Sequence, residues 1–280
     1  MDLIQAVVLG IVQGLTEFLP ISSTAHLRLV PTLFGWADPG AAFTASIQLG
    51  TLVAIVAYFA KDLWVALRAW LGSFRGGEAA RKPEARMGWA IVVGTIPIGI
   101  CGILFKDAIE GSLRSLWVIA GSLIGMGVLM LLAERFGAQR RGTGEVTVKD
   151  GVWVGLWQAI ALIPGASRSG STITGALVAG FDREAAARFS FLLSVPAILI
   201  AGVFSLAEHR KEFLGENLLP MLTANLFSFI FGYFSIAFLI RFLQRHGIRV
   251  FVLYRVVIGL VLLYLLWTGA LAPMSGIAGG

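Results

Sequence analysis

Long apolar stretches separated by short polar segments dominate the chain. Six of them hold about 20 mostly apolar residues, the length that an α-helix needs to cross the hydrocarbon core of a bilayer. The strands of an outer-membrane barrel would instead alternate apolar and polar residues. The pattern therefore predicts an all-α polytopic membrane protein with six transmembrane helices. These lie at about 43–60, 87–106, 113–133, 187–207, 218–240 and 250–268.

Two further apolar stretches, 3–19 and 151–163, run directly into polar patches. Each patch contains a proline, Pro20 or Pro164, which removes a helical hydrogen bond and favours a break in the helix. Serine and threonine residues follow each proline and favour the N-cap of a new helix, which we expect from Ala25 to Phe34 in the first patch. We therefore predict two re-entrant helical hairpins, each of which returns to the side of the membrane that it entered from.

The two halves of the chain repeat the same order of features. In each half a glutamine precedes the proline and its serine cluster, and three spans follow. An odd number of crossings then separates the two hairpins, so the second half is inverted relative to the first and the broken tips can meet near the midplane. We predict a single membrane domain, 1–280, that contains an inverted-topology repeat with halves at about 1–135 and 150–280 and a cytoplasmic linker, 136–149.

Composition and charge agree with a membrane protein. The chain is 57% apolar and 14% charged, whereas soluble domains carry about a quarter charged residues. The net charge of +6 does not indicate a nucleic-acid partner, because the basic residues lie between spans. Four of the segments between spans, 61–86, 134–150, 181–188 and 241–249, hold 15 of the 22 basic residues, and the segments on the opposite side hold 5. By the positive-inside rule the four basic segments are cytoplasmic, which places both termini outside. Segment 61–86 is expected to be a solvated loop without chemistry.

The two polar patches have the composition of a site for a small, highly charged anion. Helix N-termini attract anions, and the guanidinium of Arg168 suits phosphate. Because it cannot lose its proton, it needs an anion or a water-filled cavity at membrane depth. The hydroxyls expected to bind phosphate are those of Ser22, Thr24, Ser167, Ser169 and Thr172.

Acidic and titratable residues in the first patch indicate chemistry beyond binding. Glu17 shares a helical face with Gln13 and suits a general base or a ligand for a divalent cation. His26 can exchange a proton near neutral pH, and Ser23 or Ser22 could attack phosphorus once a base takes its proton. The catalytic candidates are therefore Glu17, Ser23, His26 and Arg168, with Gln13 and Gln48 in support.

Each of these residues also has a purely structural interpretation. Glu17 could be a buried, protonated hydrogen-bonding group, the hydroxyls could be helix caps, and Gln48 could join two helices. Tyr254 and Arg255 are expected to anchor the last span at the membrane interface. Arg28 is expected to meet lipid headgroups.

The patches resemble two motifs of the bacterial undecaprenyl-diphosphatases, also called the bacitracin-resistance family. Residues 13–26 (QGLTEFLPISSTAH) are similar to its (E/Q)GxTEFxPxSS[ST]xH region, and residues 164–172 (PGASRSGST) to its PGxSRSxxT region. The chain departs from the family at Gln13, where many members have glutamate, and at Ala25, where glycine is frequent. The first departure puts a metal site built from two carboxylates in doubt.

This resemblance implies a phosphatase of the bacterial cytoplasmic (inner) membrane that converts undecaprenyl diphosphate to undecaprenyl phosphate for peptidoglycan synthesis. It implies Glu17, Ser23, His26 and Arg168 as working residues and a divalent cation, Mg²⁺ or Ca²⁺, as cofactor. It also implies six spans with two re-entrant hairpins, a polyprenyl diphosphate lipid as substrate and a homodimer. Two rival functions stay open: a transporter of a polyprenyl phosphate or small anion, because broken helices in inverted repeats are typical of transporters, and a lipid-binding scaffold.

Overall fold

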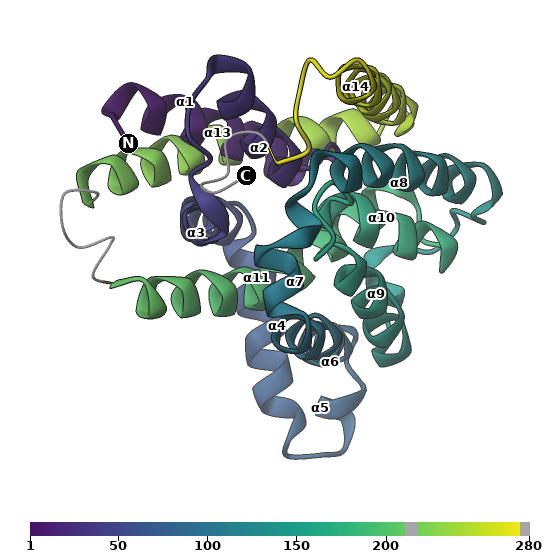
Figure 1. The fold of residues 1–280 in the computed structure, drawn as a ribbon. Helices are drawn as coiled ribbons and strands as arrows, with labels where there is room; N and C mark the ends of the chain where they lie inside the picture. The colour runs from purple at the N-terminus through teal and green to yellow at the C-terminus, as the bar shows by residue number, and fades with distance from the viewer. Residues whose placement is uncertain (211–217, 275–280) are drawn as a thin grey trace.

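The computed structural model describes residues 1–210 and 218–274, and this part of the chain is built almost entirely from helices (Figure 1). The six predicted spans are confirmed as helices that are long and apolar enough to cross a membrane. Their ends differ from the prediction by a few residues, because charged residues extend several of them beyond the apolar core. The spans are α3 Gly40–Tyr58, α6 Pro83–Leu104, α8 Leu116–Phe136, α11 Arg183–Glu208, α13 Leu218–Leu243 and α14 Arg249–Trp267.

Two pairs of short helices replace simple spans where breaks were predicted. The first pair is α1, Leu3–Phe18, and α2, Ser23–Phe34; the second pair is α9, Val148–Ile160, and α10, Arg168–Val178. None of the four helices has the length of a membrane span. The helix breaks are thus confirmed, whereas the return of each pair to its side of entry stays a prediction.

Segment 61–86 is helical rather than an irregular loop, which corrects the prediction for it. It contains α4, Ala60–Ser73, and α5, Glu78–Arg81. Helix α4 is amphipathic, and its Trp70 packs edge-on against Trp89 of α6 with ring centroids 5.8 Å apart. The high density of charged residues concealed this apolar face. Smaller elements occupy the other connections: α7 Lys106–Glu110, η1 Ser112–Arg114 and, in the predicted linker, η2 Thr143–Glu145.

The first helix of each pair packs closely along one long span. Helix α1 lies beside α13, and α9 lies beside α6 (Figure 1). Glycines permit the close approach: a Cβ on Gly10 would lie 2.9 Å from Ala224 Cα, and one on Gly155 would lie 2.7 Å from Gly94 Cα. Small residues at such contacts let two backbones pack together in a membrane.

These contacts cross between the halves of the chain. Helix α13 follows the predicted linker and receives α1, whereas α6 precedes the linker and receives α9. An inverted repeat predicts this reciprocal exchange, because each hairpin then occupies the equivalent position on the opposite half. The halves 1–135 and 150–280 stay a prediction that the packing favours. The first helix of each pair thus packs mainly on a span from the other predicted half.

We predict that Gly155→Ala destabilises the protein. The added methyl group would push α9 from α6, and overpacking of this kind costs about 1–3 kcal/mol. The matched control is Gly125→Ala in α8, where a Cβ would meet nothing within 4 Å. We expect thermal unfolding in detergent to show a lower Tm for Gly155→Ala and an unchanged or slightly higher Tm for Gly125→Ala. Equal Tm values for the two variants would contradict the close packing of α9 on α6.

Candidate functional site

Both helix breaks end in a serine with unusual backbone geometry. Ser22 caps α2 with φ 75°, and Ser167 caps α10 with φ 72°. Their hydroxyls accept hydrogen bonds from the backbone N–H groups of Ala25 at 3.3 Å and Gly170 at 3.1 Å. The predicted N-caps are confirmed. Positive φ is uncommon outside glycine, and such strain persists where the surroundings impose it, frequently at functional sites.

Glu17, in the last turn of α1, is the hub that joins the two breaks. Its Oε2 accepts hydrogen bonds from Gln13 Nε2 at 2.9 Å and from Ser23 Oγ at 2.6 Å. Its Oε1 forms a buried ion pair with Nη2 of Arg168, the first residue of α10. The same Nη2 donates to Gln48 Oε1 of α3 at 2.8 Å. The tertiary structure therefore brings together five residues that the sequence places on four different helices.

His26 lies in the first turn of α2 but has a separate set of contacts. Its Nδ1 lies 2.7 Å from the Ser22 carbonyl, which can only accept, so Nδ1 carries the proton. Its Nε2 then accepts from the Tyr254 hydroxyl at 2.7 Å, and the two rings stack at 5.6 Å. These contacts fix the ring and leave its tautomer defined.

The remaining hydroxyls mostly tie the two breaks to each other or to the backbone. Ser169 Oγ donates to the carbonyls of Glu17 at 3.3 Å and Leu19 at 3.1 Å, which lie at the first break. Thr172 Oγ1 donates to the Arg168 carbonyl at 2.7 Å and also contacts Ser190. Thr24 lies half-buried in the first turn of α2. Phosphate binding by these hydroxyls stays a prediction.

Arg255 was wrongly expected at the membrane interface. Its side chain is 0% exposed, and its guanidinium donates to the carbonyls of both helix breaks. Tyr254 is 40% exposed and reaches His26. The available signal was a charge several residues inside the last apolar span, since ionisable residues at membrane depth usually face the protein interior.

Arg28 also differs from the expectation that it meets headgroups. It is 1% exposed and lies 3.6 Å from Asp38, whose carboxylate also accepts two hydrogen bonds from Arg114 at 2.6 and 2.8 Å. Asp38 lies in the connection between α2 and α3, outside the helix that carries Arg28. No helical spacing in the sequence could therefore reveal this ion pair. These residues brace the connection rather than contact lipid.

The charge balance of the site favours an anion. Glu17 and Arg168 compensate each other, but Arg255 contributes a further positive charge, and the N-termini of α2 and α10 add partial positive charges. Among residues 1–210 and 218–274, Arg255 belongs to no ion pair with a carboxylate. A buried guanidinium without a carboxylate partner, in the same site as a carboxylate with a bound hydroxyl, is suited to hold and react with a phosphate group.

A divalent cation would find few protein ligands here. Within the described part of the chain, no group of three or more His, Cys, Asp or Glu side chains is arranged to hold a metal ion. However, Oε1 of Gln13 is buried without a hydrogen-bond partner, next to Glu17. Gln13 turns its Nε2 toward Glu17, and both carboxylate oxygens of Glu17 already have partners. Gln13 Oε1 and the Glu17 carboxylate are therefore the only two ligands that the described part of this site offers to a cation such as Mg²⁺, which commonly takes one or two protein oxygens and completes its shell with substrate phosphates and water.

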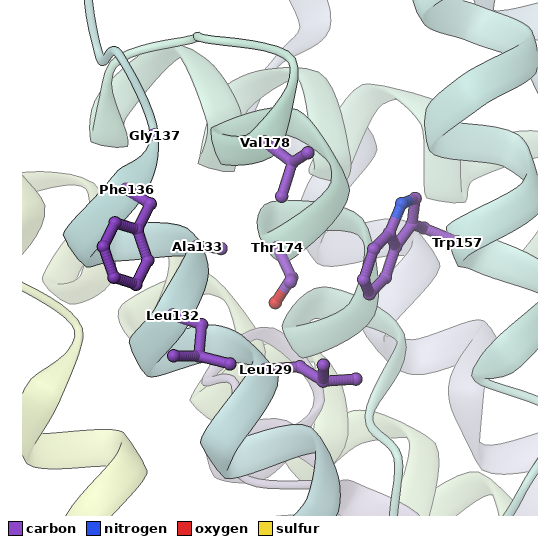
Figure 2. Close-up of a pocket in the computed structure, with 8 residues that line it drawn as sticks. All are labelled: Leu129, Leu132, Ala133, Phe136, Gly137, Trp157, Thr174 and Val178. Carbon is purple, nitrogen blue, oxygen red and sulfur yellow. The ribbon is translucent and has the colours of Figure 1, made fainter.

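A separate apolar groove of about 330 Å³ lies between α8, α9 and α10 (Figure 2). Neither Glu17 nor any of the four residues that it joins lines this groove. Thr174 is its most polar side chain, and that hydroxyl already donates to the Gly170 carbonyl at 2.6 Å. The groove therefore lacks the groups that a charged ligand needs. Its lining consists of Leu129, Leu132, Ala133, Phe136, Gly137, Trp157, Thr174 and Val178.

The chain is similar over nearly its whole length to one family model and to several known proteins. The family model "Bacitracin resistance protein BacA" matches residues 6–261. An undecaprenyl-diphosphatase of Myxococcus xanthus is 51% identical over 281 residues, which cover 99% of this chain and 93% of that protein. An undecaprenyl-diphosphatase of Chlorobaculum tepidum is 50% identical over 282 residues, covering 98% of this chain and 100% of that protein.

Proposed function

The chain belongs to the bacitracin resistance protein BacA family, and we propose that it hydrolyses undecaprenyl diphosphate to undecaprenyl phosphate and inorganic phosphate. This reaction recycles the carrier lipid for peptidoglycan synthesis. The observation that carries the proposal is the buried contact of Glu17 with both Ser23 and Arg168, which joins a general base, a hydroxyl and a phosphate-binding cation. The polyprenyl tail would remain between the helices and the bilayer lipids while the diphosphate enters the polar site.

Arg168 and the two helix N-termini are the groups suited to hold the diphosphate. The guanidinium now pairs with Glu17 Oε1, whereas Ser23 uses the other carboxylate oxygen, Oε2. Diphosphate oxygens would compete with Glu17 for Arg168. As the ion pair weakens, the carboxylate becomes a better base for the Ser23 proton. Substrate binding and activation of the hydroxyl are thereby coupled through one arginine.

The short contact between Ser23 and Glu17 favours attack by the serine over attack by water. Ser23 Oγ forms a bond to the terminal phosphorus while its proton passes to Glu17. The bond from that phosphorus to the bridging oxygen breaks, and undecaprenyl phosphate leaves. Water then hydrolyses the phosphoserine and releases inorganic phosphate. His26, in the first turn of the same short helix, would carry a proton between the site and the departing phosphates.

We also propose a divalent cation, Mg²⁺ or Ca²⁺, as cofactor. Glu17 and the unpartnered Oε1 of Gln13 are the residues that would hold it. When bound, the cation supplies charge neutralisation for the diphosphate oxygens. A glutamine rather than a second glutamate at position 13 leaves the protein with a single carboxylate there, so the substrate must provide most of the ligands.

We predict that Arg168→Ala slows phosphate release from a polyprenyl diphosphate on the order of several hundred- to a thousandfold. The basis is the loss of about 3–4 kcal/mol of charge stabilisation when one preorganised donor is removed. The measurement is phosphate release by purified protein in detergent, with Arg241→Ala as the control because that side chain is exposed at the end of α13. Near-normal turnover of Arg168→Ala would contradict the site.

The same assay separates the rival functions and tests the cofactor. A transporter has no compartments to work between in detergent, and a scaffold releases no phosphate, so turnover by the unmodified protein supports the phosphatase alone.

Phosphate release should fall on addition of a chelator and return with excess Mg²⁺ or Ca²⁺ if the cation neutralises the diphosphate. Full activity in the chelator would remove the cation from the proposal.

We predict a transient phosphoserine at Ser23. Rapid quench of the enzyme mixed with substrate labelled on its terminal phosphate should trap acid-stable label in the protein. Ser23→Ala should abolish the label and turnover together. Ser22→Ala should retain the label, because Ser22 contributes mainly a helix cap worth about 1 kcal/mol. A Ser23→Ala protein that turns over without any label would show that water attacks instead.

The protein is a multi-pass membrane protein, and we propose that it lies in the bacterial cytoplasmic membrane with both termini outside. This orientation places the segments with the excess of basic residues, such as 61–86, on the cytoplasmic side, as the positive-inside rule requires. In a Cys101→Ala background, a membrane-impermeant maleimide added to spheroplasts should label Ala37→Cys but not Arg75→Cys; both positions are exposed. The reverse labelling pattern would invert the orientation. A homodimer stays a prediction from the family resemblance.

A further inference from the structure

Arg255 connects more parts of the proposed site than any of the residues assigned to it above. One guanidinium donates hydrogen bonds to five backbone carbonyls. Nη1 contacts the Pro20 carbonyl at 3.1 Å, in the first break, and Nη2 contacts Gly165 at 2.8 Å and Ala166 at 3.1 Å, in the second break. The other two carbonyls are those of Ser122 and Leu123 in α8, at 3.3 and 3.2 Å.

The carbonyls at the breaks require a donor for a physical reason. The carbonyls that Arg255 contacts at the breaks belong to loop residues beyond the ends of α1 and α9, so no helix supplies their partners. A buried backbone carbonyl without a donor costs free energy comparable to a lost hydrogen bond. The described loops at the breaks place the Pro20, Gly165 and Ala166 carbonyls in the protein interior, around one side chain. An arginine carries five N–H groups in a planar fork, so it can satisfy acceptors from both loops at once.

The backbone of the second break is shaped to admit this guanidinium. Gly165 has φ 96°, a conformation that favours glycine. A Cβ on Gly170, in the first turn of α10, would lie 3.3 Å from Arg255 Nη1 and 3.1 Å from Ser167 Cβ. A Cβ on Gly165 would instead lie 2.6 Å from the Ile119 carbonyl oxygen and 2.9 Å from Ser122 Cβ, so this glycine lets the second break lie against α8. Gly170 leaves room for the guanidinium two residues after Arg168.

The residue before Arg255 extends the same support to the histidine. Tyr254 donates to His26 Nε2 at 2.7 Å and stacks on the ring. Two consecutive residues of α14 therefore contact the first break, the second break and the proton carrier. Helix α14 itself packs along α8, which fixes its position.

We propose that Arg255 is a positioning residue that sets the distance between the two helix breaks, and thereby between Ser23 with Glu17 on one side and Arg168 on the other. The inference rests on the proposed site, because Arg255 acts through those residues. A fixed distance matters since a displacement of about 1 Å in a reacting group can lower a rate about 100-fold. Its positive charge also has no carboxylate partner among the described residues, which keeps the site receptive to an anion.

Lysine at this position would retain the charge but not the geometry. Its ammonium has three N–H groups at one point and cannot bridge acceptors that surround a planar fork. We expect Arg255→Lys to fold with a lower Tm, because the ammonium leaves some of the five carbonyls without a donor, and to lower kcat about 10- to 100-fold while KM changes much less. The matched control is Arg114→Lys, another buried arginine, which pairs with Asp38 and contacts neither break. It should keep kcat.

Gly170→Ala provides a second, milder variant if Arg255→Lys does not fold. The added methyl group would lie 3.1 Å from Ser167 Cβ and 3.3 Å from Arg255 Nη1. It therefore crowds the guanidinium and the cap of α10 without removing any hydrogen-bonding group, so we expect a smaller decrease of kcat, again with little change of KM. Unchanged kcat in both variants overturns the proposal. An equal loss of kcat in Arg114→Lys also overturns it, because the effect would then belong to any buried arginine.

A double-mutant cycle distinguishes positioning from general damage. If Arg255 acts through Arg168, the effects of Arg255→Lys and Arg168→Lys on kcat/KM should be smaller together than the product of the two single effects, because coupled residues are not additive. Multiplicative effects overturn the positioning role. Should Arg168→Lys alone have no effect, the failure lies in the proposed site rather than in the role of Arg255.

Discussion

The ion pair between Glu17 and Arg168 is the contact on which the proposed site depends. It joins the end of α1 to the beginning of α10, two helices that begin more than 160 residues apart in the sequence. Neither charge would be stable alone in an apolar interior, because an isolated buried ion costs several kcal/mol. The pair therefore holds the two breaks together. A phosphate that replaces the carboxylate as partner of Arg168 would find a site already prepared for an anion.

The broken helices support the proposed function and create a problem of stability. They leave N–H groups and carbonyls without the partners that an unbroken span supplies within itself. At the starts of α2 and α10, the side chains of Ser22 and Ser167 each accept a hydrogen bond from one backbone N–H group. The other N–H groups of the first turns remain suited to an anion. Arg255 donates to the carbonyls of Pro20, Gly165 and Ala166, whereas Ser169 donates to those of Glu17 and Leu19. In the proposed site, one arginine thus acts through its contact with Glu17, and the other holds the backbone that positions it.

Packing around the breaks follows from the same constraint. A short helix buries little surface of its own, so it needs a close neighbour. Gly10 and Gly14 on α1, and Gly151 and Gly155 on α9, allow backbone-to-backbone contact with α13 and α6. Each of these two short helices thereby lies alongside a full span from the other predicted half of the chain.

Sequence alone determined the membrane class, the six spans, the two breaks and the residues around them, because these features depend on local composition, on proline and on the length of apolar runs. It also placed Glu17, Ser23 and Arg168 in one site, through the resemblance of the two motifs. It did not reveal α4 as a helix, the burial of Arg28 or the role of Arg255. Those depend on which surfaces face each other: an arginine in an apolar run looks the same whether it meets headgroups, a distant aspartate or the carbonyls of two broken helices. Only the tertiary structure decides among them, because burial and hydrogen-bond partners arise from contacts between segments far apart in the chain.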